Sequence, residues 1–306
     1  MRVVAVILNW KRADLTLRCL RSVRHHAPDV VPLVVDNASG DGSVEAIRSE
    51  DPRVEILEGQ TNRGYAGGNL AGGDRAFEMG ADAVLILNND VELGHACAEA
   101  LVGAALADPQ RGIVAPVSLK ASDHRMIDMH TATVDLRRMD VVAHGRDTDR
   151  MPHGDEESDY APGSSLMITR EAWKRTGGFD ERFFLVWEDV DLSLRVAKAG
   201  LKRPLIIANA HVFHEGSSTF GGAETPLYRY FLARNSFLLA SKHLGPMQRQ
   251  LTRHRLRRRY SGWAKSATDP RIAHALRLGS KHGRAGRFGP TPEEVGRFGP
   301  TPEELG

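Results

Sequence analysis

Short apolar runs alternate with stretches of helical spacing along the first 120 residues. The runs lie at 3–8, 33–35, 54–57, 84–87 and 112–117. Each is typical of a strand buried in a parallel sheet. Helical spacing follows the first three runs, and strands that alternate with helices favour right-handed βαβ units and one parallel sheet. The pattern therefore predicts an α/β fold.

The stretch after the first run illustrates the helical spacing. Leu17, Leu20 and Val23 recur on one helical face, and Asp14 precedes them in a position suited to an N-cap. We therefore expect a helix that begins at Asp14 and packs its apolar face on the sheet.

Polar residues follow three of the apolar runs directly. Asn9 ends the first run, Asp36 ends the second, and Asn88, Asn89 and Asp90 end the fourth. Ligands of open α/β sheets bind beyond the carboxyl ends of the strands. A carboxylate in this place suits a hard cation that carries a phosphate, although a strand followed by an Asx turn has the same pattern.

Composition agrees with a large enzyme domain. The chain has 306 residues, of which 41% are hydrophobic, and this length allows a full core. Cys19 and Cys97 fall in helical stretches without metal-ligand spacing, which favours a reducing cytosol. No apolar run approaches the roughly 18 residues of a membrane span, and no signal-peptide pattern follows Met1. We expect a cytoplasmic protein that is soluble or peripheral to a membrane.

Charge divides the chain unevenly. Residues 242–306 carry 14 Lys and Arg against 5 Asp and Glu, a net charge of +9, which leaves −7 for residues 1–241. The basic cluster Arg253–Tyr260, with Tyr260 and Trp263 as aromatic anchors, fits an interfacial helix on anionic lipid. A solvated basic helix fits the same residues, and no nucleic-acid-binding module accompanies the charge.

Five ordered segments resemble family 2 glycosyltransferases of the GT-A fold, particularly the rhamnosyltransferase-like branch. They are VILNWKRADL, VVDNASGDGSVE, NRGYAGGN, LILNND and GGFDERFFLVWEDVDLSLRVAKAG. The resemblance covers roughly residues 3–240. It implies a Rossmann-like nucleotide-binding fold with a mainly parallel central sheet, to which the chain adds a basic helical C-terminal extension.

The expected domains follow from this resemblance and from the composition. They are a catalytic domain at 1–241 (donor half about 1–118, acceptor half about 119–241), a basic helical extension at 242–285 and a repeat tail at 286–306. The tail holds GRFGPTPEEV and GRFGPTPEEL in tandem. Two short copies rich in Gly and Pro cannot build a core, so a mobile tail or a docking peptide is expected.

For the metal, Asp90 resembles the last aspartate of the family's DXD motif, which binds Mn²⁺ or Mg²⁺. Asn88 stands where the motif has its first aspartate, so the site has less negative charge. The resemblance implies His214 as a further ligand, and imidazole suits Mn²⁺ better than Mg²⁺. His211 competes for this role, and a hydrogen-bonded structural histidine is the alternative.

For catalysis, the resemblance implies Asp189 as the general base, with Glu188 as the alternative base. Both open a predicted helix, where carboxylates are held favourably. Asp191 fits a supporting or capping role. Trp187 is expected to stack on an acceptor sugar, and a core tryptophan is the alternative.

For the nucleotide, Asp36 resembles the family aspartate that accepts a hydrogen bond from a pyrimidine N3–H, which favours UDP or dTDP donors. Asn9 is expected beside it. The other residues expected at the nucleotide-sugar are Asn37, Arg63, Gly68, Asn69, Asn89, Gly163 and Ser164. Asn37 also fits a turn, and the glycine segment also fits a helix start.

The resemblance implies an inverting, metal-dependent transferase of cell wall or polysaccharide biosynthesis. It moves a sugar, with rhamnose favoured, from a dTDP- or UDP-sugar to a hydroxyl of a glycan, a lipid-linked or a small-molecule acceptor. A furanosyl or hexosyl transferase on the same scaffold is an alternative. A non-catalytic nucleotide-sugar-binding protein and a nucleic-acid-binding protein are alternatives of another class.

Overall fold

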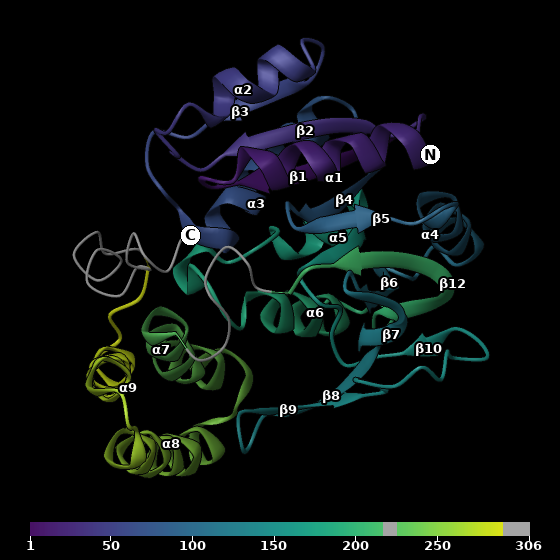
Figure 1. The fold of residues 1–306 in the computed structure, drawn as a ribbon. Helices are drawn as coiled ribbons and strands as arrows, with labels where there is room; N and C mark the ends of the chain where they lie inside the picture. The colour runs from purple at the N-terminus through teal and green to yellow at the C-terminus, as the bar shows by residue number, and fades with distance from the viewer. Residues whose placement is uncertain (217–224, 290–306) are drawn as a thin grey trace. The chain divides into compact units, whose positions relative to one another are not determined.

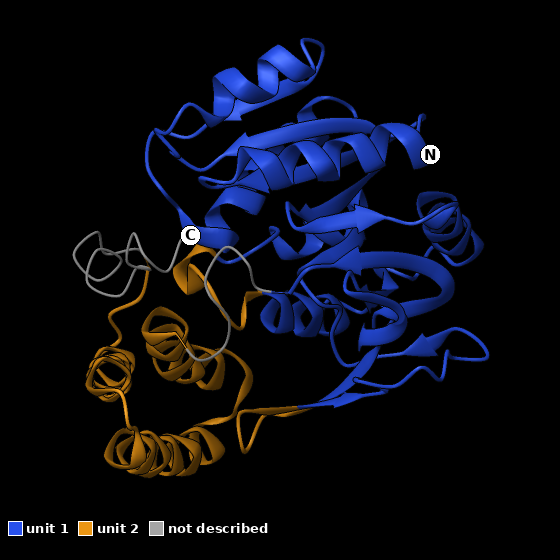
Figure 2. Ribbon diagram, viewed as in Figure 1, with its two compact units in different colours: residues 1–133, 142–180, 189–216 blue, residues 134–141, 181–188, 217–306 orange. Residues whose placement is uncertain are grey.

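The computed structural model describes residues 1–216 and 225–289 (Figure 1). The chain forms two compact units, coloured separately in Figure 2. The first unit contains residues 1–133, 142–180 and 189–216, and the second contains 134–141, 181–188 and 217–306. The domain boundaries at 241 and 285 stay predictions. The first repeat begins at Gly286, so its residues 286–289 are described, and the rest of both repeats lies outside the described residues.

The first unit is built on one ten-stranded sheet in the order β10-β12-β6-β11-β4-β1-β2-β3, with β5 beside β12 and β7 beside β6. The strands are β1 (Val3–Asn9), β2 (Val31–Asp36), β3 (Glu55–Glu58), β4 (Ala83–Asn88), β5 (Val91–Leu93), β6 (Ile113–Lys120), β7 (Asp123–Met129), β10 (Glu156–Glu157), β11 (Ser165–Thr169) and β12 (Leu205–His214). Strands β3, β2, β1 and β4 run parallel, as do β6 and β12, whereas β11 is antiparallel to β4 and β6. The predicted α/β fold and its five strands are confirmed.

Helices cover both faces of this sheet. They are α1 (Ala13–His26), α2 (Ser43–Glu50), α3 (Gly64–Glu78), α4 (Cys97–Ala107), α5 (Arg170–Thr176) and α6 (Glu188–Lys198). Successive side chains of β1 point to opposite faces. Ile7 belongs to the core cluster that includes Leu20 of α1. Val6 lies on the other face, where a Cβ atom added at Gly72 of α3 would come 2.5 Å from it.

The start of α1 differs from the expected N-cap. The N-cap residue is Arg12, which makes no side-chain capping bond, and Asp14 lies inside the first turn. Asp14 pairs with Arg12 at 2.9 Å, so its carboxylate stays close to the positive end of the helix. The expectation that Asp14 caps α1 is therefore wrong by two residues.

The second unit contains three long helices, α7 (Pro226–His243), α8 (Pro246–Ser266) and α9 (Pro270–Arg284), together with the short 3₁₀ helix η1 (Glu181–Phe183). It also takes in the tip of the hairpin between β8 (Thr131–Asp135) and β9 (Asp140–His144). Tyr260 of α8 is buried with its hydroxyl 2.7 Å from Ser236 of α7. Tyr260 is therefore part of the core, and the expectation that it anchors to lipid is wrong.

Candidate active site

The polar residues predicted at strand ends come from neighbouring strands. In the parallel register Asn9 of β1 lies opposite Asp36 of β2, and Leu8 lies opposite Asn88 of β4. Because these strands share a direction, their carboxyl ends meet at one edge of the sheet. Asn9, Asp36 and the residues after Asn88 therefore lie along this edge.

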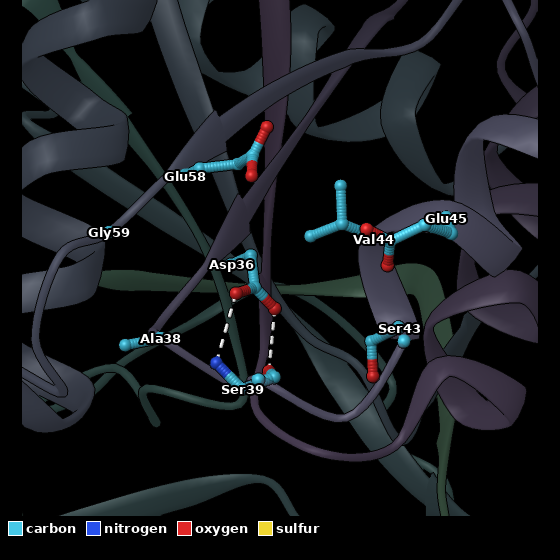
Figure 3. A pocket seen from close by; sticks show the side chains of 10 residues that line it. Asp36, Ala38, Ser39, Ser43, Val44, Glu45, Glu58 and Gly59 are labelled. Atoms are coloured by element: carbon cyan, nitrogen blue, oxygen red, sulfur yellow. Dashed lines mark hydrogen bonds between the residues drawn. The ribbon is translucent and has the colours of Figure 1, made fainter.

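Asp36 lies at a pocket with a volume of about 530 Å³, shown in Figure 3. Its Oδ1 accepts hydrogen bonds from Asn9 Nδ2 at 2.8 Å and from the Ser39 hydroxyl at 2.5 Å, and its Oδ2 accepts one from the Ser39 amide at 3.0 Å. Each carboxylate oxygen can accept more than one hydrogen bond, so Asp36 is oriented and keeps capacity for a ligand donor. Ser39 was not among the residues expected from the sequence.

Asn9 itself is fully buried behind Asp36. Its Oδ1 accepts a hydrogen bond from the Thr16 hydroxyl at 2.6 Å, and Asn89 Nδ2 lies 3.4 Å from the same hydroxyl. Thr16 therefore links the end of β1 to the end of β4. In this arrangement Asn9 holds Asp36 in place, and direct nucleotide contacts by Asn9 and Asn89 stay predictions.

Asn37 organises the loop before α3. Its Nδ2 donates to Asn62 Oδ1 and to the Gly64 carbonyl, both at 3.0 Å, and its Oδ1 accepts from the Arg63 amide at 2.9 Å. The side chain therefore acts as the loop-forming residue that one sequence interpretation allowed. The bonding also places the half-buried Arg63 next to Asn37 in the loop.

Gly68 and Asn69 lie inside α3 and face the sheet. A Cβ atom at Gly68 would overlap Leu8 of β1, so the glycine allows helix and sheet to pack closely. Asn69 is fully buried, and its Nδ2 donates to the Tyr65 carbonyl at 3.1 Å. Packing accounts for Gly68, whereas the Asn69 Oδ1 atom is buried without a hydrogen-bond partner among the described residues; contact of either residue with a nucleotide stays a prediction.

His214, at the end of β12, lies between two carboxylates. Its Nδ1 is 2.8 Å from Asp128 Oδ2, and its Nε2 is 3.5 Å from Asp90 Oδ1. His211 is three residues away, and its Nε2 is 3.0 Å from the carbonyl of Ala208 in the same strand. Of the two histidines that the sequence offered, the structure brings His214 to Asp90.

The charges around His214 shift two pKa values. Burial alone would lower the pKa of His214, but hydrogen bonds and charge attraction from Asp128 and Asp90 outweigh it and raise the pKa to about 9. For Asp128, burial would raise the pKa, but its hydrogen bond to His214 and the nearby cations Arg146 and Lys120 lower it. The pair is thus bonded as imidazolium and carboxylate near neutral pH.

Asp189 at the start of α6 is held by a loop of the sheet. Its Oδ2 accepts a hydrogen bond from the Gly163 amide at 3.0 Å, and the Gly163 carbonyl accepts one from the Tyr65 hydroxyl. Burial raises the pKa of Asp189, against the lowering effect of the amides of Gly163 and Val190. A carboxylate with a raised pKa has the property required of a general base. Gly163 therefore orients Asp189.

Two residues near Asp189 have structural partners. The carbonyl of Ser164 accepts a hydrogen bond from the Asn88 amide at 2.9 Å, next to the end of β4. Asp191 is fully buried and pairs with Arg195 at 2.7 Å, one helical turn later. Asp191 thus supports α6, in agreement with the supporting role expected for it.

Trp187 and Glu188 belong to the second unit. Trp187 is 7% exposed, and its indole N–H has no hydrogen-bond acceptor in the described part of the chain. Little of its ring is open for stacking, whereas a buried N–H without a partner is rare and calls for a reason. The expected stacking on a sugar stays a prediction.

Comparison with known proteins identifies the class. The chain has the GT-A fold of glycosyltransferases. It resembles GalNAc-T7 solved with UDP, GalNAc and Mn²⁺ (TM-score 0.58, 14% identity, covering 84% of this chain and 54% of that chain). It also resembles a mannosyltransferase of Pyrobaculum calidifontis solved with GDP-Man and Mn²⁺ (TM-score 0.56, 15% identity, covering 94% and 88%). The family model "Glycosyl transferase family 2" matches residues 4–175, so the chain belongs to this family.

A relative of known activity indicates which branch of the family this chain is similar to. N-acetylglucosaminyl-diphospho-decaprenol L-rhamnosyltransferase of Mycobacterium tuberculosis is 28% identical over 233 residues, which cover 70% of this chain and 75% of the relative. The chain is therefore a family 2 glycosyltransferase similar to rhamnosyltransferases. The GalNAc-T7 chain is the longer one in its comparison, and this chain spans about half of its length.

Proposed function

We propose that this chain transfers a sugar, with rhamnose as the first candidate, from a dTDP- or UDP-sugar to a hydroxyl group, with inversion at the anomeric carbon. Asp189 takes the proton of the attacking hydroxyl, whose oxygen forms a bond to the anomeric carbon. The bond between that carbon and the diphosphate breaks, and the nucleoside diphosphate leaves with the electron pair. Glu188 is the alternative base.

The main support for the proposal is the position of two side chains in a chain of family 2. Asp90, which follows β4, lies close to His214 at the end of β12. His214 Nε2 and Asp90 Oδ1 are both buried, and they lie 3.5 Å apart, which is longer than an ordinary hydrogen bond. Two ligands of one Mn²⁺ or Mg²⁺ ion lie about 3 Å apart, given bond lengths of about 2.1 Å. The two side chains therefore fit as ligands of such an ion.

The remaining ligands would come from outside the protein. Residues 1–216 and 225–289 contain no cluster of three or more His, Cys, Asp or Glu side chains suited to hold a metal ion. Mg²⁺ typically keeps several waters and binds substrate phosphates together with one or two carboxylates. A bound divalent cation would neutralise charge on the diphosphate. Asp90 and His214 would then hold the ion tightly only with the nucleotide present.

The geometry around Asp36 favours a pyrimidine base in the donor nucleotide. Its carboxylate is oriented by Asn9 and Ser39 at the pocket of Figure 3, and it can accept a further hydrogen bond from the N3–H of uracil or thymine. The mycobacterial relative is named for a diphospho-decaprenol acceptor. By analogy we propose a lipid-linked acceptor for this chain, with glycans and small molecules as alternatives. Such an acceptor would require peripheral contact with the membrane, which we propose on its cytoplasmic side.

The proposal is tested by calorimetric binding of dTDP-rhamnose, other dTDP-, UDP- and GDP-sugars, and UDP alone, with and without Mn²⁺. We expect pyrimidine sugars to bind, Mn²⁺ to tighten binding, and dTDP-rhamnose to be preferred. Asp36→Ala should remove the preference for pyrimidines over purines. Preference for another sugar, with its transfer seen by product analysis, would favour the furanosyl or hexosyl alternative. Binding without transfer or hydrolysis would indicate a non-catalytic module.

A further inference from the structure

The segment from Phe183 to Trp187, directly before Glu188, has an unusual backbone. The φ angles of Phe184, Val186 and Trp187 are +64°, +70° and +78°. This left-handed region is disfavoured for residues with side chains, and most strongly for a β-branched residue such as Val186. Such conformations persist only where the surroundings hold them, and they cluster at functional sites.

Asn235 of α7 holds this segment through its side-chain amide. The Nδ2 atom lies 2.8 Å from the Phe183 carbonyl, 2.7 Å from that of Leu185 and 3.0 Å from that of Val186. An amide nitrogen has two hydrogens, so at least one is shared between two carbonyls. Asn235 is fully buried, and the three carbonyls turned toward one nitrogen match the left-handed backbone between them.

Arg234 holds the other side of the same segment. Its guanidinium is fully buried and donates to the carbonyls of Arg182 at 3.1 Å, Phe183 at 2.9 Å and Gly289 at 2.6 Å. Its Nε donates to Asn235 Oδ1 at 2.9 Å, which fixes the Asn235 amide with its nitrogen toward the segment. Burying a cation is costly, so a buried arginine used to order backbone carbonyls indicates a constraint beyond simple packing.

The segment ends at two residues with proposed roles. Trp187 presents a buried indole N–H that no described residue accepts, and Glu188 begins α6 immediately before Asp189. An orphaned buried donor beside strained backbone is the pattern of a binding group kept for a ligand. The conformation of residues 183–187 sets the position of this N–H and of Glu188, which belongs to the same unit.

We infer that Arg234 and Asn235 are positioning residues for the transfer reaction, because they hold residues 183–187 in the left-handed conformation that orients Trp187 and Glu188. The inference rests on the proposed function and adds to it. Neither residue would touch the substrate. Their effect would be on the rate of the bound complex, since small displacements of reacting groups reduce turnover more than binding.

The test compares Asn235→Ala with Ser236→Ala, which removes a neighbouring buried hydroxyl of α7 that bonds to Tyr260 instead. Both proteins are labelled with 5-fluorotryptophan, and the Trp187 resonance is assigned with Trp187→Phe. We expect Asn235→Ala to shift or broaden the Trp187 resonance and to lower kcat by about 10- to 100-fold, with unchanged nucleotide Kd. Ser236→Ala should lower only the melting temperature.

A second variant tests the backbone conformation directly. Val186→Gly removes the penalty on a positive φ, although it also removes a side chain that packs against the apolar cluster of this unit. If Asn235 acts by holding this backbone, Val186→Gly/Asn235→Ala should recover part of the kcat that Asn235→Ala loses. If Asn235→Ala alone does not fold, the double variant is compared with Ser236→Ala in its place. Equal kcat in the Asn235 and Ser236 variants, or no recovery of kcat in the folded double variant, would overturn the inference. If the wild-type protein transfers no sugar, the proposed function fails instead, and the fluorine spectrum alone decides whether Asn235 holds Trp187.

Discussion

The imidazole of His214 joins Asp128 to Asp90: Nδ1 lies 2.8 Å from Asp128 Oδ2, and Nε2 lies 3.5 Å from Asp90 Oδ1. A histidine that donates from Nδ1 to a carboxylate has its Nε2 lone pair free for a metal when the ring is neutral. Asp128 thereby sets which nitrogen of His214 faces the proposed metal site.

Removing Asp128 should weaken metal binding. We expect Asp128→Ala to raise the Kd for Mn²⁺ in the presence of UDP by about 10- to 100-fold, as measured by electron paramagnetic resonance. Asp128→Asn keeps an acceptor for Nδ1–H and should lose less. Asp123→Ala is the control, because Asp123 is on the same strand but pairs with the exposed Arg125. If His214→Ala weakens Mn²⁺ binding and Asp128→Ala does not, Asp128 has no part in the site.

The same ion pair should make the metal-free protein less stable at high pH. The pKa of His214 is about 9 in the folded protein against an ordinary 6.5. A raised pKa contributes stability that is complete below about pH 6.5 and is lost as pH rises through about 9. The loss amounts to up to about 3 kcal/mol in the free energy of unfolding.

This pH effect is measured by urea unfolding of wild type and His214→Asn across that range. The two curves should converge at high pH, because the neutral histidine no longer has the ion pair. If the free energies of unfolding of the two proteins differ by the same amount at every pH, His214 does not titrate between about pH 6.5 and 9. Since a metal replaces the Nε2 proton, Mn²⁺ binding with nucleotide should also weaken as pH falls.

Substitution of Asp189 should mainly lower turnover, whereas substitution of Asp191 should mainly lower stability. Asp189→Asn removes the proposed base and should lower kcat by about 10²- to 10⁴-fold, with unchanged nucleotide Kd. Its single amide oxygen can accept from only one of the Gly163 and Val190 amides that now donate to Asp189, so we expect a loss of about 1 kcal/mol of folding free energy. Asp191→Asn breaks a buried ion pair with Arg195, and we expect it to cost about 3 kcal/mol of folding free energy.

The pH profile adds to this comparison. Because burial raises the pKa of Asp189, kcat should fall on the acid side at a higher pH than an exposed aspartate would give. Near-normal turnover in Asp189→Asn would move the role of base to Glu188, which Glu188→Gln then examines.

The positions of Asp36 and Asp90 could be predicted because local sequence determines them. Each follows an apolar run that ends abruptly, and parallel strands bring such ends together. The five motifs, in their order along the chain, also allowed the family to be predicted. The same local reasoning placed the cap of α1 at Asp14, because it weighed residue type without knowing where the backbone turns, and Arg12 is the N-cap.

Asp128 and the 183–187 segment could not be predicted, because both depend on distant pairing. Asp128 lies in a region without a readable period, and it reaches His214 only because β6 pairs with both β7 and β12. Val186 adopts a positive φ against its local preference. Its reason is Asn235, about fifty residues later in the chain.

The exposed face of α8 should bind anionic membranes. Met247, Leu251, Arg255 and Arg258 are all exposed at helical spacing, with Met247 76% and Leu251 55% exposed, whereas Leu256 is buried on the opposite face. Apolar side chains followed by arginines on one face suit an interfacial helix. No helix in residues 1–216 and 225–289 has the length and apolar character to span a bilayer, so contact through α8 would be peripheral.

Vesicle flotation tests this face. Wild type should float with vesicles containing phosphatidylserine, less so at high salt, and should not float with phosphatidylcholine alone. Arg255→Glu/Arg258→Glu should lower binding by about 30-fold or more, at about 1 kcal/mol per charge. Arg53→Glu/Arg125→Glu, with the same net charge but substitutions at exposed positions outside α8, should bind as wild type does. Equal loss in both double variants would indicate attraction by net charge alone and would remove α8 as the binding face.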